Sequence, residues 1–187
     1  MKKILSLVGS LTVVCGVCAA VLAYVNGVTE EPIKEIKVKL EQEAVKAVMP
    51  PGAEKVEAVA WADAEKKTPV AFAGKDASGK TVGYAAKGTS GEGYGGDIVL
   101  MVGFQPDKKT IVAYRTLSAA ETPGLGMNLN TPEFAGQFTG KDGSSLKVKK
   151  DGGEIEAITS ATITSRAVCG AIADAQGKFG KAGTETP

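Results

Sequence analysis

The sequence predicts an α+β protein in which one N-terminal transmembrane helix precedes a single domain with a mainly antiparallel sheet and flanking helices. Residues 4–25 contain no charged side chain. A series of short apolar runs separated by turn-rich breaks follows between residues 56 and 117. Near-neighbour strands joined by short loops pair antiparallel, and an amphipathic helical pattern over 163–179 closes the chain.

The apolar stretch 4–25 predicts a retained membrane anchor. At 1.5 Å per residue it makes a helix about 33 Å long, enough to cross a bilayer. Lys2 and Lys3 precede it, as in a signal peptide or a signal anchor, but residues 22–25 form a poor cleavage site. Long downstream domains translocate largely regardless of charge. We therefore expect a single-pass protein of the cytoplasmic (inner) membrane, with its soluble domain on the outer, periplasmic side.

Composition shifts divide the rest of the chain. Residues 28–32 predict a short connector, and apolar residues then recur at helical spacing from Ile33 to Val48, before Pro50 and Pro51 end the pattern. We expect this helix to pack one face on the sheet. The expected segments are an anchor over 1–27, a connecting helix over 28–52, a folded domain over 53–180 and a disordered tail over 181–187.

The elements of the folded domain follow from local patterns. Strands are predicted over 56–61, 70–73, 81–86, 97–104 and 110–117, with further strands over 146–149 and 154–158. A short helix is predicted from Thr131, as its N-cap, to Phe138. Residues 87–96 are rich in glycine and fit either a flexible loop or a backbone wall beside a ligand.

The composition excludes several classes of chemistry. The chain has no histidine, which excludes Ser-His-Asp catalysis and histidine-ligated haem and removes the usual zinc ligands. The formal net charge of +1 gives no sign of a nucleic-acid partner. Cys15 and Cys18 lie inside the apolar stretch and fit small packing residues better than metal ligands, and Cys169 lies in the last helical pattern. We expect no catalytic side chain and no metal, so a cofactor would carry any chemistry.

A cluster of hydroxyl groups lies where the run 154–158 meets the last helical pattern. Thr159 and Ser160 are good N-cap residues, and small Ala161 leaves space beside Thr162. A helix start offers unpaired N–H groups and a partial positive charge, which suit a phosphate. The alternative is a capped helix with no ligand.

A second motif covers residues 121–126. Pro123 fixes one backbone angle, and Gly124 can adopt a positive φ, so Leu125 projects from a rigid loop. A flat ring can lie against the backbone around Gly124 and Gly126. The alternative is a tight turn after the strand that ends at residue 117.

Together the two motifs resemble the FMN-binding domain family. The family's attachment motif runs acid, two variable residues, Ser/Thr, Gly/Ser, Ala, Thr, a variable residue and Ser/Thr, and is filled here by Glu156, Thr159, Ser160, Ala161, Thr162 and Thr164. The resemblance implies that FMN is joined through its phosphate to the Thr162 hydroxyl, with Thr159 and Thr164 donating hydrogen bonds to the phosphate. It also implies a separate flavin transferase that uses FAD.

The second motif implies contacts with the isoalloxazine ring, from Glu121, Thr122, Gly124, Leu125 and Gly126. The chain departs from the family at three places. Glu156 stands where aspartate is usual, and Ser160 stands where glycine is commonest. Many relatives have a histidine shortly before the loop, where this chain has residues 118–120, Ser-Ala-Ala.

The short length and single anchor look most like the G subunits of Rnf-type complexes, which couple electron flow between ferredoxin and NAD to ion movement. The resemblance implies a membrane-anchored flavoprotein subunit that relays electrons beside other membrane subunits, not a stand-alone enzyme. Two alternatives stay open: a flavinylated carrier of another respiratory or extracellular electron-transfer chain, and a non-redox, membrane-tethered interaction module.

Overall fold

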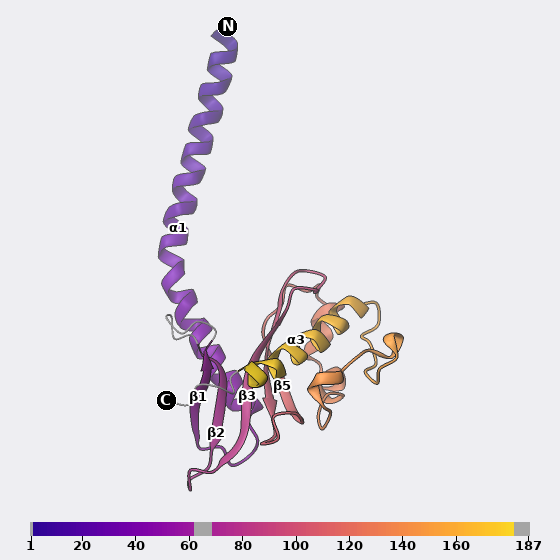
Figure 1. Cartoon of the computed structure of the whole chain (residues 1–187). Coiled ribbons are helices and arrows are strands. Elements are labelled where there is room, and N and C mark those ends of the chain that lie inside the picture. Colours follow the sequence, from indigo (N-terminus) through magenta and orange to yellow (C-terminus); the bar gives the residue numbers. More distant parts are fainter. Residues whose placement is uncertain (1, 62–68, 182–187) are drawn as a thin grey trace. The chain divides into compact units, whose positions relative to one another are not determined.

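The computed structural model describes residues 2–61 and 69–181 of the 187-residue chain. The chain divides into two compact units, Met1–Leu40 and Glu41–Pro187. Of the expected tail, only Lys181 is described, as the last residue of a helix, and residues 182–187 lie outside the described part. The helices and strands (Figure 1) are α1 (Lys2–Val48), β1 (Lys55–Trp61), β2 (Pro69–Lys75), β3 (Thr81–Ser90), β4 (Ile98–Phe104), β5 (Ile111–Ser118), α2 (Pro132–Gly136) and α3 (Thr162–Lys181). Three 3-10 helices lie between β5 and α3: η1 (Gly126–Asn130), η2 (Gly143–Ser145) and η3 (Lys149–Asp151).

Helix α1 is continuous, and the prediction of a connector over 28–32 is wrong. Pro32 lies inside the helix. Proline lacks the N–H that would complete one helical hydrogen bond, yet the helix continues on both sides of Pro32. An 18-residue window within Leu7–Val48 has a mean hydropathy of 2.2 and is not buried in the structure. This helix is therefore long and apolar enough to cross a membrane.

The strands form one antiparallel sheet in the order β1-β2-β3-β4-β5, which confirms the predicted fold class. The structure corrects one boundary, because residues 87–90 belong to β3 and pair with β4 as far as Ser90 opposite Ile98. Helix α3 packs closely on β3 at Gly88, where an added Cβ would lie 1.9 Å from the Ala171 carbonyl oxygen. This close packing explains why a glycine-rich segment continues the strand.

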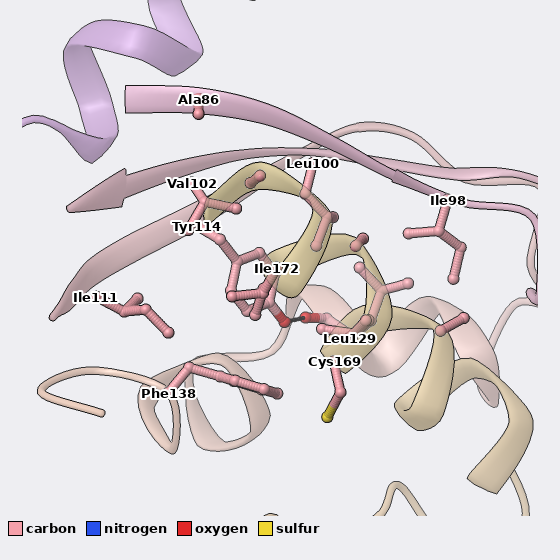
Figure 2. Packing of buried hydrophobic residues seen from close by; sticks show 14 of the residues in the cluster. Ala86, Ile98, Leu100, Val102, Ile111, Tyr114, Leu129, Phe138, Cys169 and Ile172 are labelled. Atoms are coloured by element: carbon pink, nitrogen blue, oxygen red, sulfur yellow. Dashed lines mark hydrogen bonds between the residues drawn. The ribbon is translucent and has the colours of Figure 1, made fainter. Parts of the chain in front are cut away.

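One face of the sheet carries the main core (Figure 2). The inward side chains of β4 are fully buried against α3, and they are Ile98, Leu100, Val102 and Phe104. The predicted apolar stripe of α3 is confirmed, and its buried residues are Val168, Ala171, Ile172 and Ala175. Phe179 continues the stripe and meets Phe104 edge to face, with ring centroids 5.4 Å apart. The buried Tyr114 hydroxyl donates to the Leu129 carbonyl, which ties β5 to the segment after it.

The last turns of α1 pack on the opposite face of the sheet, as predicted for the connecting helix. Val45 and Val48 are buried there against Met101 of β4. The Lys87 ammonium lies 2.8 Å from the Glu41 carboxylate, both partly buried, which joins the same helix end to β3.

The segment before α3 is less regular than predicted. Neither 146–149 nor 154–158 forms a strand, and the two runs share a single parallel bridge between Val148 and Ile155. Both residues are buried in the main core, so their apolar character reflects burial without a sheet. The short helix α2 ends at Gly136, earlier than predicted. The Thr131 hydroxyl donates to the Asn128 carbonyl at 2.8 Å and does not cap that helix.

Candidate functional site

Helix α3 begins at Thr162, later than an N-cap at Thr159 or Ser160 requires, so both capping predictions are wrong. The first intrahelical bond runs from the Ser165 N–H to the Ala161 carbonyl at 3.0 Å. Ala161 therefore occupies the N-cap position, and the N–H groups of the first helical residues have no partner one turn back.

Buried Ser165 closes the turn before the helix. Its hydroxyl accepts from the Ile158 N–H at 2.9 Å and donates to the Ala161 carbonyl at 2.9 Å. Ser160 lies within this turn and has a φ of +61°. This left-handed conformation favours glycine, which gives a physical reason for the glycine that the FMN-binding family most often has here. Thr159 and Ser160 are exposed, and Thr162 is half-buried.

A buried hydrogen bond brings the two sequence motifs together. The Thr164 hydroxyl donates to Glu121 Oε2 at 2.8 Å, although 43 residues separate them. Thr164 is 1% exposed and Glu121 is 6% exposed. The other carboxylate oxygen of Glu121 accepts from the Gly95 N–H at 3.3 Å. Glu121 thus joins its own loop to α3 and to the glycine-rich segment. We call Glu121, Thr164 and Gly95 the Glu121 node.

The glycine-rich segment is a packed turn at this node. An added Cβ at Gly95 would lie 1.8 Å from the Ala120 carbonyl oxygen, so the two backbones touch. The close packing argues against a flexible loop at Gly95, and a ligand beside this backbone stays a prediction.

The loop 121–126 turns as its sequence predicts. Gly124 has a φ of +76°, and the Thr122 carbonyl accepts from the N–H groups of Leu125 and Met127 at 3.2 Å each. Leu125 is 43% exposed, and Gly126 is buried at the start of η1. The residues that precede Gly95 and Thr164 in the sequence are also apolar and exposed. Tyr94 is 72% exposed, and Ile163 is 48% exposed.

Three consecutive residues of η3 contact the segment that carries the attachment motif. The orange segment in Figure 1 that contains η3 lies beside the start of α3. The contacts join Lys149 to Glu156, Lys150 to Thr162 and Asp151 to Arg166. Lys150 Nζ lies 3.2 Å from Thr162 Oγ1. Arg166 donates two hydrogen bonds of 2.7 Å to Asp151, which hold the pKa of that carboxyl below its usual value.

Glu156 makes its contacts with η3 and with Gln137. Its exposed carboxylate pairs with Lys149. Its backbone is held by Gln137, whose Oε1 accepts from the Glu156 N–H at 2.7 Å and whose Nε2 donates to the Glu156 carbonyl at 3.3 Å. Sequence reasoning missed Gln137, Lys150 and Arg166, because no local motif marks them and their contacts exist only in the folded domain.

The cysteines show no sign of a metal site. Among the described residues, no group of three or more His, Cys, Asp or Glu side chains is arranged to hold a metal ion. Cys15 and Cys18 are exposed on α1. Cys169 is buried, and burial raises the pKa of its thiol to about 11.

The fold and the paired motifs define an FMN-binding domain, and the family of that description matches residues 93–176. The chain is 34% identical to the G subunit of the ion-translocating oxidoreductase complex of Methanosarcina acetivorans, over 91% of this chain and 92% of that protein. It is 32% identical to the G subunit of the proton-translocating ferredoxin:NAD(+) oxidoreductase complex of Clostridium ljungdahlii, over 93% and 90%. The chain therefore belongs to the family formed by the G subunits of these complexes.

A solved structure shares the fold. It is the C subunit of the Na(+)-translocating NADH-quinone reductase from Parabacteroides distasonis, with a TM-score of 0.51 and 21% identity over 71% of this chain and 77% of that chain. At this identity the likeness shows the fold alone.

Proposed function

We propose that this chain is a membrane-anchored flavoprotein subunit that relays electrons in an Rnf-type ferredoxin:NAD oxidoreductase complex. Three relatives that are 32–34% identical to this chain are named as G subunits of ion-translocating oxidoreductase complexes. The match covers 84–92% of their length. The structural observation that supports the proposal is the buried hydrogen bond from Thr164 to Glu121. It holds the attachment motif and the ring-binding loop in one place. When bound, FMN supplies one- and two-electron chemistry that the side chains of this chain lack.

We further propose that FMN is esterified to the Thr162 hydroxyl. Thr162 is the first residue of α3 and is only half-buried, as a residue that carries a bulky group must be. Three exposed apolar side chains, which a flat aromatic ring could cover, belong to residues next in sequence to the node residues or in the Glu121 loop: Tyr94, Leu125 and Ile163. The residues present therefore fit the cofactor. A covalent bond keeps the cofactor in place where a helix start alone contributes only about 0.3–1 kcal/mol.

The remaining site residues are assigned as follows. The exposed Thr159 hydroxyl is available to a phosphate, whereas the Thr164 hydroxyl donates to Glu121 and is 1% exposed. We propose that both hydroxyls donate hydrogen bonds to the phosphate. For Thr164 that role requires the hydroxyl to turn away from Glu121. We propose that Thr122, Gly124 and Gly126 form the backbone surface beside the ring, and that Ser160 and Ala161 leave room for the phosphate.

The surroundings of the protein belong to the same proposal. A separate flavin transferase attaches the cofactor from FAD, and other membrane subunits exchange electrons with it. We propose that residues 1–27 of α1 are the anchor, that residues 28–48 of the same helix and residues 49–52 after it form the connection, and that the FMN-binding domain covers 53–180. The domain faces the outer side of the cytoplasmic membrane.

Intact-mass analysis tests the attachment. The full chain is expressed with a flavin transferase, and its mass and its in-gel flavin fluorescence after denaturation are measured. We expect one added FMN in the wild type, mapped by peptide analysis to Thr162, and none in Thr162→Ala. Thr139→Ala is the matched control, because Thr139 is an exposed threonine outside both motifs, and it should retain the flavin. An unmodified wild type would refute the covalent assignment. Co-purification with polytopic subunits tests the complex: a flavinylated chain that never associates with them would indicate another electron-transfer chain.

A further inference from the structure

Lys150 has an unusual position for a lysine. Its ammonium contacts the Thr162 hydroxyl at the start of α3. The positive end of the helix dipole repels a cation, at a cost of about 0.3–1 kcal/mol at an exposed position. An anion beside Thr162 would offset this cost.

The turn that carries Lys150 is fixed from both sides. The Lys149 N–H donates to the Ile155 carbonyl at 2.8 Å, and the Asp151 N–H donates to the Val148 carbonyl at 2.8 Å. Val148 and Ile155 are buried in the main core. The stem of Lys150 thus leaves the backbone at a position that the core sets, although the side chain itself is exposed.

The charges around Lys150 point the same way. Lys149 faces the Glu156 carboxylate, and Arg166 faces the Asp151 carboxylate with two hydrogen bonds. Each of these contacts pairs one positive charge with one negative charge. Lys150 lies near enough to Asp151 to contribute to the lowered pKa of that carboxyl, but its hydrogen-bond contact is with the neutral Thr162 hydroxyl, 3.2 Å away. A phosphodiester on Thr162 adds one negative charge, which matches the single positive charge of Lys150.

We infer that Lys150 is a phosphate-binding residue that pairs with the phosphodiester formed on Thr162. The inference rests on the proposed function, because that phosphodiester is the link to FMN. In the attachment step, Thr162 Oγ forms a bond to the FMN phosphorus of FAD. The bond from that phosphorus to the bridging pyrophosphate oxygen breaks, AMP leaves and the hydroxyl proton passes to solvent. Lys150 binds the phosphate charge before and after this step.

The experiment uses the full chain in detergent with FAD and a purified flavin transferase. Intact mass gives the initial rate of FMN attachment, and the ³¹P resonance of the modified protein reports on the phosphodiester itself. The variants are Lys150→Gln, Lys150→Arg and, as the matched control, Lys147→Gln. Lys147 is an exposed lysine of the same loop, so its loss changes the net charge equally.

We expect Lys150→Gln to slow attachment about five- to tenfold, as for a charge-assisted hydrogen bond at an exposed site, and Lys150→Arg to restore the rate to within about threefold. Lys147→Gln should change the rate less than about twofold. After prolonged incubation, the ³¹P resonance of Lys150→Gln should differ from that of the wild type, while that of Lys147→Gln should not. A changed ³¹P resonance in Lys150→Gln supports the contact between Lys150 and the phosphodiester, whatever the rate of attachment.

An unchanged ³¹P resonance in Lys150→Gln overturns the inference, even if attachment slows, because the lysine then acts on the transferase. In that case Thr162 still carries FMN, and the proposed function stands. A wild type without FMN, or one that carries it at another residue, overturns both proposals.

Discussion

Removal of the Thr164 hydroxyl should destabilise the domain by an amount that the structure allows us to estimate. In Thr164→Val the side chain keeps its shape, but Glu121 Oε2 loses its 2.8 Å donor. Because Glu121 is 6% exposed, solvent replaces that donor poorly. Hydrogen bonds to charged groups contribute about 1.5–3 kcal/mol, so we expect the free energy of unfolding to fall by about 2 kcal/mol.

Urea unfolding of the full chain in detergent, followed by circular dichroism, measures this change. With a denaturant dependence of about 2 kcal/mol/M, the midpoint should fall by about 1 M. Thr139→Val is the matched control, because Thr139 is exposed and its hydroxyl donates to the Val112 carbonyl at 3.2 Å. Its effect should stay within about 0.5 kcal/mol.

A double-mutant cycle with Glu121→Gln tests whether the two residues act together. Residues in one buried hydrogen-bonded pair show interaction energies of about 0.5–3 kcal/mol. Additive effects of Thr164→Val and Glu121→Gln, or a Thr164→Val variant as stable as the wild type, would refute the reasoning that this bond holds the node together.

Three further outcomes follow from local geometry and can be checked directly. Ser160→Gly removes a side chain at φ +61° and should raise the free energy of unfolding by about 0.5–1 kcal/mol in the same urea assay. Burial and the raised thiol pKa should protect Cys169 from iodoacetamide at about pH 8 in the folded chain, once both anchor cysteines are serine, and mass analysis should find alkylation only after unfolding. Asp151→Asn should lower the thermal midpoint at about pH 7. The pKa of Asp151 is lowered in the folded state by Arg166, so the wild type holds this stability above the ordinary carboxyl pKa and loses it as the pH falls through the folded-state value. The two proteins should therefore melt alike at strongly acidic pH, and a difference that persists there would contradict this assignment.

The regular part of the fold was predictable because its signals are local. Each strand from β1 to β5 corresponds to an apolar run bounded by turn residues, and the stripe of α3 has plain helical spacing. The predictions failed where the same local sequence pattern is compatible with two different structures. Val148 and Ile155 are apolar because they are buried, and their flanking residues complete no ladder. Pro32 is a helix breaker by propensity, yet it lies within α1.

The candidate site was predictable only as two separate motifs. Their sequences indicate a phosphate-binding helix start and a rigid loop, but neither contains the information that Glu121 would accept from Thr164. Lys150 lies outside both motifs, and Arg166 follows the attachment motif by two residues without being part of it. Their roles depend on the path of the chain between Val148 and Ile155, which no periodicity in the sequence indicates. The capping prediction failed because Ser165, one turn into the helix, closes the preceding turn from inside.

The Glu121 node also has a consequence for the order of events in biogenesis. Its residues come from three stretches of chain that lie 26 and 43 residues apart in the sequence, so they meet only in the folded domain. In an unfolded or misfolded chain, Thr162 lies on an unstructured segment, without Lys150 or the loop 121–126 beside it. If Thr162 is the flavin carrier, prosthetic-group loading should then serve as a readout of correct tertiary structure, and yellow colour should mark the molecules that are fit for assembly.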